Sequence, residues 1–275
     1  MNELGLSVYI LIFVNAIFTF MGFKDVAFFN QYSFKVDKVL VNKDYKRLIS
    51  SGFLHSGWLH FLMNMSSLYF FSLGIASLLG TIQFFVIYFF SLVAGNLLAL
   101  YVHRNHGDYS GVGASGAICG LMFGSIALFP GIDIYIFYFG LPGWLFGLIF
   151  VLLTISAIKS KTTNIGHEAH LGGGLMGLLI ALAFSPSAIL DNYIAILLMA
   201  VPSMAFLIYI ILKPETLIIG NSKKEKNQYW DIEEKYHYER KFKEKELNAL
   251  LEKISKKGIN SLSAKEKARL EELSK

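Results

Sequence analysis

The stretch GVGASGAICG, residues 111–120, lies between a short polar segment, HRNHGDYS, and a long apolar run. Ser115 is followed by Gly116, Gly120 and Gly124 at intervals of four residues, which places these glycines on one face of a helix. A helix face without side chains lets a second helix approach closely, as it does in membranes. The stretch therefore predicts a membrane helix that packs tightly along its glycines and begins with a serine.

The composition supports a membrane environment. The 275 residues are 54% hydrophobic with a mean hydropathy of +0.50, which is too apolar for a single water-soluble core. About 20 apolar residues are needed to cross a hydrocarbon core of ~30 Å. Apolar stretches near this length occur at 4–23, 58–78, 81–102, 114–129, 132–157, 168–185 and 189–212. We therefore predict an all-α, polytopic membrane bundle of seven transmembrane helices.

The first apolar stretch, 4–23, lacks a basic region before it and a small-residue cleavage site after it. We expect it to be a retained helix rather than a signal peptide. The predicted membrane domain covers 1–212, with a core of about 1–185 and an extra span at 189–212. The protein is expected to be a multi-pass integral membrane protein.

The tail, 213–275, has a different composition from the rest of the chain. It carries 16 of the 25 lysines and arginines against 12 acidic residues, so we expect a basic segment outside the bilayer. Its net charge would suit an anionic lipid surface or an acidic partner, and no specific partner is assigned. Helical signals in it are Leu247, Leu250, Leu251 and Ile254 at helical spacing, a terminating Gly258, and a capping box of Ser263 and Glu266.

Polar side chains inside the predicted spans are the best candidates for function, because such groups are costly in hydrocarbon. In HSGWLHFLMN, residues 55–64, His60 and Asn64 are four residues apart and lie on one helix face. Taken alone, they could equally be polar groups that bond neighbouring helices.

In GHEAHLGGGLMG, residues 166–177, His170 precedes Gly173 by three residues and Gly177 by seven. The histidine and a second row of glycines therefore share a helix face. If the fourth and sixth spans pack through their glycines, Ser115 and His170 meet at the contact.

This combination has the parts of an acyl-transfer site. A serine hydroxyl is a weak nucleophile, and an imidazole within ~2.6 to 3.2 Å can remove its proton during attack. The oxyanion that forms needs preorganised donors, which His60, Asn64 and the backbone amide of Ser115 could supply. No aspartate within the spans is placed to orient His170, so the sequence favours a dyad over a triad.

The motifs HFLMN, GASG and AHLGGGLMG, in this order on separate spans, resemble those of the rhomboid intramembrane serine proteases. The resemblance covers about residues 1–185, with a seventh span added as in six-plus-one members. It implies Ser115 as nucleophile, His170 as general base, and His60 and Asn64 as oxyanion donors. It also implies a water-accessible site below the membrane surface and no metal or organic cofactor. The substrate it implies is another protein's transmembrane segment, cut near small residues.

Two positions depart from the family pattern. Cys119 stands where the family commonly has an aromatic residue that packs on the base. The end of the second span, FSLGIASLLG, lacks a glutamate that many members use to brace the first loop. This loop corresponds to 24–57 here.

Charge and resemblance imply opposite orientations of the site. Seven spans put every lysine and arginine on the side from which Ser115 and His170 enter their helices, and the positive-inside rule makes that side cytoplasmic. Resemblance to bacterial rhomboids implies a site that faces away from the cytoplasm. We follow the resemblance for the site and leave the side of the tail open.

Two other functions are compatible with parts of the sequence. The first is a non-catalytic rhomboid-like protein that binds transmembrane clients, although such proteins usually lose the serine or the base. The second is a metal transporter that uses the side chains of His55, His60, His167, Glu168 and His170. HEAH is one residue too short for the zinc-protease pattern HExxH. No nucleic-acid partner is expected.

Overall fold

The computed structural model describes residues 3–136, 138–160 and 166–212, and in the tail 247–248, 250–255, 261–263, 266–267 and 269–270. The chain divides into two compact units, Met1–Lys223 and Lys224–Lys275, each of which is described by itself. The predicted domain boundary after residue 212 falls next to positions outside the described residues, so it stays a prediction.

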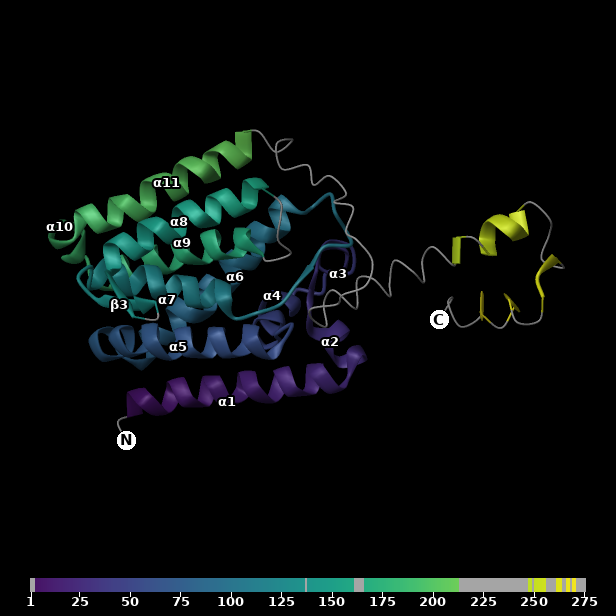
Figure 1. The fold of residues 1–275 in the computed structure, drawn as a ribbon, viewed down its shortest axis with the longest axis horizontal. Coiled ribbons are helices and arrows are strands. Elements are labelled where there is room, and N and C mark those ends of the chain that lie inside the picture. Colours follow the sequence, from purple (N-terminus) through teal and green to yellow (C-terminus); the bar gives the residue numbers. More distant parts are fainter. Residues whose placement is uncertain are drawn as a thin grey trace. The chain divides into compact units, whose positions relative to one another are not determined.

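Among the described residues of the first unit, seven main helices form a bundle, which confirms the predicted polytopic helical bundle. Five of them, α1, α5, α6, α9 and α11, are long and apolar enough to cross a membrane, whereas α7 and α8 are shorter. Figure 1 shows α1 beside α5, then α7 and α9, with α8 and α11 beyond them. Their bounds are α1 Glu3–Lys24, α5 Trp58–Leu79, α6 Thr81–Val102, α7 Ser115–Leu128, α8 Gly143–Ser160, α9 His167–Phe184 and α11 Tyr193–Leu212, and the short α10 is Ala188–Asp191.

The predicted fifth span, 132–157, is wrong over its first eleven residues. These form an antiparallel hairpin of β3, Asp133–Ile136, and β4, Phe139–Pro142, and α8 begins only at Gly143. The hairpin is rich in isoleucine and aromatic residues, which favour strands, and the proline directly precedes the helix. Mean hydropathy over a long window does not distinguish an apolar hairpin from an apolar helix.

Helix α7 lies at the centre of the bundle. All its residues from Gly116 to Leu128 are buried, and α9, α6 and α5 pack around it. Its 14 residues span about 21 Å, which is less than the ~30 Å hydrocarbon core. At its C-terminal end the Asn192 side chain donates to the carbonyl oxygens of Ala127 (2.9 Å) and Leu128 (3.2 Å), which would otherwise lack partners. A helix this short must have at least one end within the membrane.

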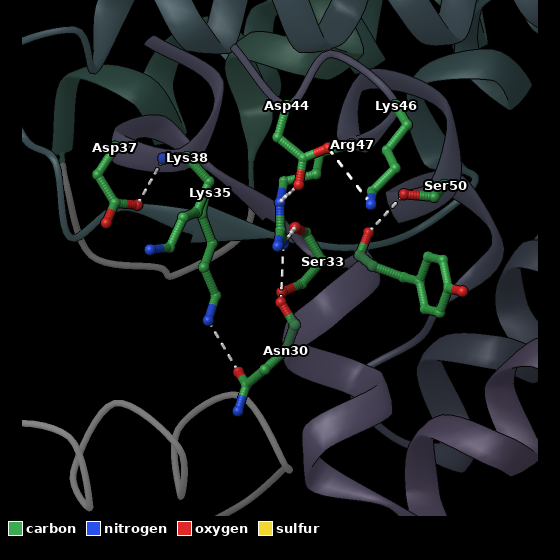
Figure 2. A network of polar contacts seen from close by, with 10 residues as sticks. Asn30, Ser33, Lys35, Asp37, Lys38, Asp44, Lys46, Arg47 and Ser50 are labelled. Carbon is green, nitrogen blue, oxygen red and sulfur yellow. Dashed lines mark hydrogen bonds and ion pairs between the residues drawn. The ribbon is translucent and has the colours of Figure 1, made fainter. Parts of the chain in front are cut away.

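A polar network holds the connection between α1 and α5 (Figure 2). Arg47 is buried, its Nε donates to Asp44 (2.8 Å), and its Nη1 donates to the carbonyl oxygens of Asn30 and Ser33 (2.7 Å each). The Ser50 hydroxyl donates to the carbonyl oxygen of Tyr32 at 2.8 Å. This first loop, for which the sequence lacks the bracing glutamate, is therefore braced by an arginine of its own. It contains α2 Val26–Tyr32, β1 Phe34–Lys35, α3 Val36–Leu40, α4 Arg47–Ser50 and a short 3-10 helix, η1 Ser51–Phe53.

The same connection is tied to the segment that leads into α7. Strand β1 pairs in antiparallel fashion with β2, Ser110–Gly111, and the amide of Gly113 donates to the carbonyl oxygen of Ser51 at 3.0 Å. On α6, the Asn96 side chain donates to the carbonyl oxygen of Leu48 at 2.8 Å. These bonds fix the position of the segment just before Ser115.

In the second unit the predicted capping box is confirmed. The Ser263 amide donates to the Glu266 carboxylate at 2.7 Å, and the Glu266 amide donates to the Ser263 hydroxyl at 3.2 Å. Lys253 lies 2.7 Å from the same carboxylate and, with these hydrogen bonds, lowers the pKa of Glu266 to about 2. The predicted first tail helix includes the described helical residues 250–255, and its expected terminator, Gly258, lies outside the described residues.

Candidate active site

Ser115 and His170 are brought together from two different helices. Ser115 is the first residue of α7, and His170 lies in the first turn of α9. The Nε2 atom of His170 lies 2.7 Å from the Oγ atom of Ser115. This is hydrogen-bond distance between a hydroxyl and a ring nitrogen that can accept its proton.

The predicted glycine rows lie at the contact between α7 and α9. A Cβ atom on Gly173 would overlap the carbonyl group of Gly116, and one on Gly177 would overlap the backbone of Gly120. A Cβ atom on Gly120 would lie 2.9 Å from the carbonyl oxygen of Gly173. Gly116 is less restricted, since its nearest neighbour would be the Ala169 carbonyl oxygen at 3.3 Å. Three of the four predicted glycines therefore exclude any side chain.

Helix α6 supplies a second close contact that the sequence analysis missed. A Cβ atom on Gly95 would lie 2.5 Å from the carbonyl oxygen of Ala169, the residue just before His170. Ser91, one turn earlier, lies against Gly120 and Gly173. The signal was present in SLVAG, residues 91–95, where two small residues are spaced by four. Both α6 and α7 therefore set the position of the N-terminal part of α9.

His60 faces the same site across Gly113. A Cβ atom on Gly113 would lie 2.9 Å from the Nε2 atom of His60 and 3.7 Å from the Oγ atom of Ser115. Gly113 also has φ of 128°, a backbone conformation that favours glycine. It is a site residue that the sequence analysis did not single out, although it lies two residues before Ser115. Its missing side chain leaves the space through which the His60 ring approaches the serine.

The Asn64 side chain is buried one turn after His60, and its Nδ2 atom donates to the carbonyl oxygen of His60 at 2.9 Å. A carboxamide nitrogen carries two protons, so one N–H remains after this bond. Within the described part of the chain, no hydrogen bond joins Asn64 to Ser115. His60 and Asn64 lie on adjacent turns of α5, and His60 faces Gly113, two residues before α7 begins.

An aromatic ring does lie beside His170, but it comes from α8. The centroid of the Phe150 ring is 6.2 Å from that of His170, with 36° between the planes. The His167 ring, three residues earlier in the same first turn of α9, lies 5.5 Å from the His170 ring and edge-on to it. Cys119, which departs from the aromatic residue of the family pattern, is buried in α7.

The remaining residues of the transporter hypothesis have other partners. The Nδ1 atom of His55 lies 2.8 Å from the Thr19 hydroxyl of α1, and Glu168 lies 3.5 Å from His103 at the end of α6. Among the described residues, no group of three or more histidine, cysteine, aspartate or glutamate side chains could hold a metal ion. The Glu168–His103 pair instead connects the start of α9 to the end of α6.

Comparisons with known proteins agree with this architecture. Residues 42–187, just over half of the chain, match the Rhomboid domain, and residues 230–275 match a family of unknown function (DUF6576). The chain is 34% identical over 148 residues to Putative rhomboid protease YdcA of Bacillus subtilis, covering 52% of this chain and 68% of that protein.

Two mitochondrial relatives are longer proteins. Rhomboid protein 1 of Saccharomyces cerevisiae is 34% identical over 150 residues, covering 51% of this chain and 43% of the relative. RHOMBOID-like protein 12 of Arabidopsis thaliana is 31% identical over 142 residues, covering 46% and 42%. The chain therefore spans less than half the length of these two relatives.

Proposed function

The chain belongs to the rhomboid family of membrane proteins, and on that premise we propose that it is an intramembrane serine endopeptidase. Its substrates are transmembrane segments of other membrane proteins, and its membrane is the plasma membrane of a bacterium. The observation that carries the proposal is the 2.7 Å contact between His170 Nε2 and Ser115 Oγ. A non-catalytic client-binding protein has no need of this contact.

In the acylation step, His170 Nε2 takes the proton of the Ser115 hydroxyl while Oγ attacks the carbonyl carbon of the scissile bond. The carbonyl oxygen becomes a tetrahedral oxyanion. When the intermediate collapses, the peptide C–N bond breaks and His170 returns the proton to the leaving amine. An acyl-enzyme on Ser115 results, and water activated by the same histidine hydrolyses it.

Three donors are assigned to the oxyanion. The amide of Ser115 is the first in α7, where helix N–H groups lack intrahelical acceptors. His60 Nε2 and the second N–H of Asn64 are the side-chain donors, both presented by the first turns of α5. Removal of one such donor typically lowers kcat about a hundredfold to a thousandfold.

Cleavage of a generic transmembrane reporter by the purified protein in lipid tests this proposal, with Ser115→Ala as the matched control. The expected result is two fragments with the wild-type protein, cut within the reporter's span, and an intact reporter with Ser115→Ala. Binding of the reporter without cleavage by the wild-type protein would favour the client-binding function instead.

A further inference from the structure

We propose that Ser56 fixes the tautomer of His60 and is thereby a positioning residue for the oxyanion site. The role of Ser56 in catalysis rests on the proposed function, whereas the tautomer of His60 does not depend on that function. Ser56 lies just before Gly57, the N-cap of α5, and four residues before His60. Its hydroxyl oxygen lies 3.0 Å from His60 Nδ1, and its backbone amide donates to the same nitrogen at 3.5 Å.

The two contacts at Nδ1 determine where the imidazole proton resides. A backbone amide can only donate, so Nδ1 must act as the acceptor, and the Ser56 hydroxyl can donate to it as well. A neutral imidazole carries one proton on its two nitrogens. With Nδ1 as acceptor, that proton lies on Nε2.

The Nε2 atom is the one that faces the reacting serine. It lies beside Gly113, within 2.9 Å of the position that a Cβ atom would occupy there, and Ser115 Oγ lies 3.7 Å from the same position. The Nε2 proton is therefore directed toward the region where the oxyanion develops. With the opposite tautomer, His60 would present a lone pair to that negative charge.

The surroundings keep this arrangement in place. Ser56 is 8% exposed, so solvent competes little for its hydroxyl. The His55 ring packs edge-on against His60 with 5.1 Å between centroids, and His55 is itself held by Thr19 of α1. The His55 ring thus restrains the imidazole of His60, and Ser56 is the neighbour that selects its tautomer.

The test combines kinetics with a spectroscopic measurement on the full chain in lipid. The variants are Ser56→Ala, Ser56→Thr, which keeps the hydroxyl, and Ser77→Ala. Ser77 is a matched control because it also lies on α5, and its exposed hydroxyl donates only within its own helix, to Gly74 at 3.0 Å. Imidazole 15N shifts, with His60 assigned through His60→Gln, report the tautomer directly.

We expect Nε2–H in the wild-type protein and a mixture of tautomers in Ser56→Ala. The kcat for reporter cleavage should fall about tenfold or more in Ser56→Ala, with KM within about twofold, because one oxyanion donor is partly lost. Ser56→Thr and Ser77→Ala should retain most of the wild-type kcat.

Three results would overturn the inference: a proton on Nδ1 of His60 in the wild-type protein, an unchanged tautomer in Ser56→Ala, or equal losses of kcat in Ser56→Thr and Ser56→Ala. The wild-type spectrum decides the matter even if Ser56→Ala does not fold. Absence of turnover in the wild-type protein would contradict the proposed function and leave the tautomer measurement valid.

Discussion

Gly177 of α9 lies against the backbone of Gly120 of α7, so closely that a Cβ atom on Gly177 would overlap the Cα and carbonyl of Gly120. Two turns away, at the other end of the same contact, Ser115 and His170 are in hydrogen-bond contact. The distance between the two helix backbones therefore sets the distance between nucleophile and base. Any atom added at the glycine contact has to move one helix away from the other.

We predict that Gly177→Ala and Gly173→Val lower both stability and activity. Overpacking in a tight contact typically costs ~1 to 3 kcal/mol, and a displacement of ~1 Å at a reacting pair can lower the rate about a hundredfold. Activity is expected to fall although neither glycine is proposed to touch the substrate. Thermal midpoints and cleavage rates, measured in one lipid, check this prediction.

Gly74→Ala is the appropriate control for these variants. A Cβ atom on Gly74 of α5 meets only the Phe129 ring, at an ordinary 3.7 Å. Gly147 is less suitable, because its Cβ atom would lie 2.7 Å from Met199 Sδ on α11. Wild-type rates in both contact variants would show that the glycines do not set the Ser115–His170 distance.

The glycine spacing was visible in the sequence because small residues at intervals of four mark a helix face. The role of Gly113 was not visible in this way, since it depends on His60 approaching from α5 and on a positive φ at one residue. The role of Ser56 was not predictable from the sequence either, because its bond to His60 depends on the conformation of the chain just before α5. Motif spacing predicts which side chains share a helix, whereas contacts between loops and helices follow from packing.

Arg47 and Lys46 both interact with Asp44, but only Arg47 is predicted to matter for stability. Arg47 is buried and donates to three acceptors, and removal of hydrogen bonds to a charged group typically costs about 1.5 to 3 kcal/mol. Lys46 is more than half exposed and lies 3.6 Å from Asp44, an arrangement worth ~0 to 1 kcal/mol. We expect Arg47→Met to lower the thermal midpoint clearly.

Lys46→Met is the matched control and should have little effect on the midpoint. Arg47→Lys should behave more like Arg47→Met than like the wild-type protein, because an ammonium group lacks the planar fork that reaches Asp44, Asn30 and Ser33 together. Equal thermal midpoints for Arg47→Met and Lys46→Met would contradict the claim that Arg47 stabilises the loop between α1 and α5.

His55 is predicted to make stability depend on pH below neutrality. Burial, and next to it the nearby His60, lower the pKa of His55 from 6.5 to about 3. Between these pH values the unfolded chain binds a proton that the folded chain excludes, so stability falls as the pH falls. The slope from one such group is at most about 1.4 kcal/mol per pH unit.

The measurement is the thermal midpoint of the wild-type protein and of His55→Gln between pH 7 and pH 4, of which about 2.5 units, from pH 6.5 to pH 4, lie between the two pKa values. The carboxylates of the chain contribute to both curves. The difference between the two curves therefore isolates the contribution of His55. We expect the wild-type midpoint to fall more steeply than that of His55→Gln. Parallel curves would show that His55 takes up its proton in the folded protein.

Hydropathy predicted where the main apolar helices lie, but not the interior of the connections. Seven spans were predicted, and among the described helices five are long and apolar enough to cross a membrane. The segment 132–142 is as apolar as a helix, but its isoleucine and aromatic residues favour strands, and the chain reverses between Ile136 and Phe139. The β1–β2 pair joins Phe34 and Gly111, which are 77 positions apart, and no local pattern encodes such a relationship. Both features nevertheless help to fix the ends of α7.

The most direct test of the central claim is the rate at which a fluorophosphonate modifies Ser115, measured by mass spectrometry on the intact protein in lipid. A serine activated by His170 should form a covalent adduct on Ser115 in the wild-type protein, and His170→Ala should slow its formation by about a hundredfold or more. No adduct on Ser115 in the wild-type protein, or an equal rate in His170→Ala, would contradict the assignment of these two residues as nucleophile and base.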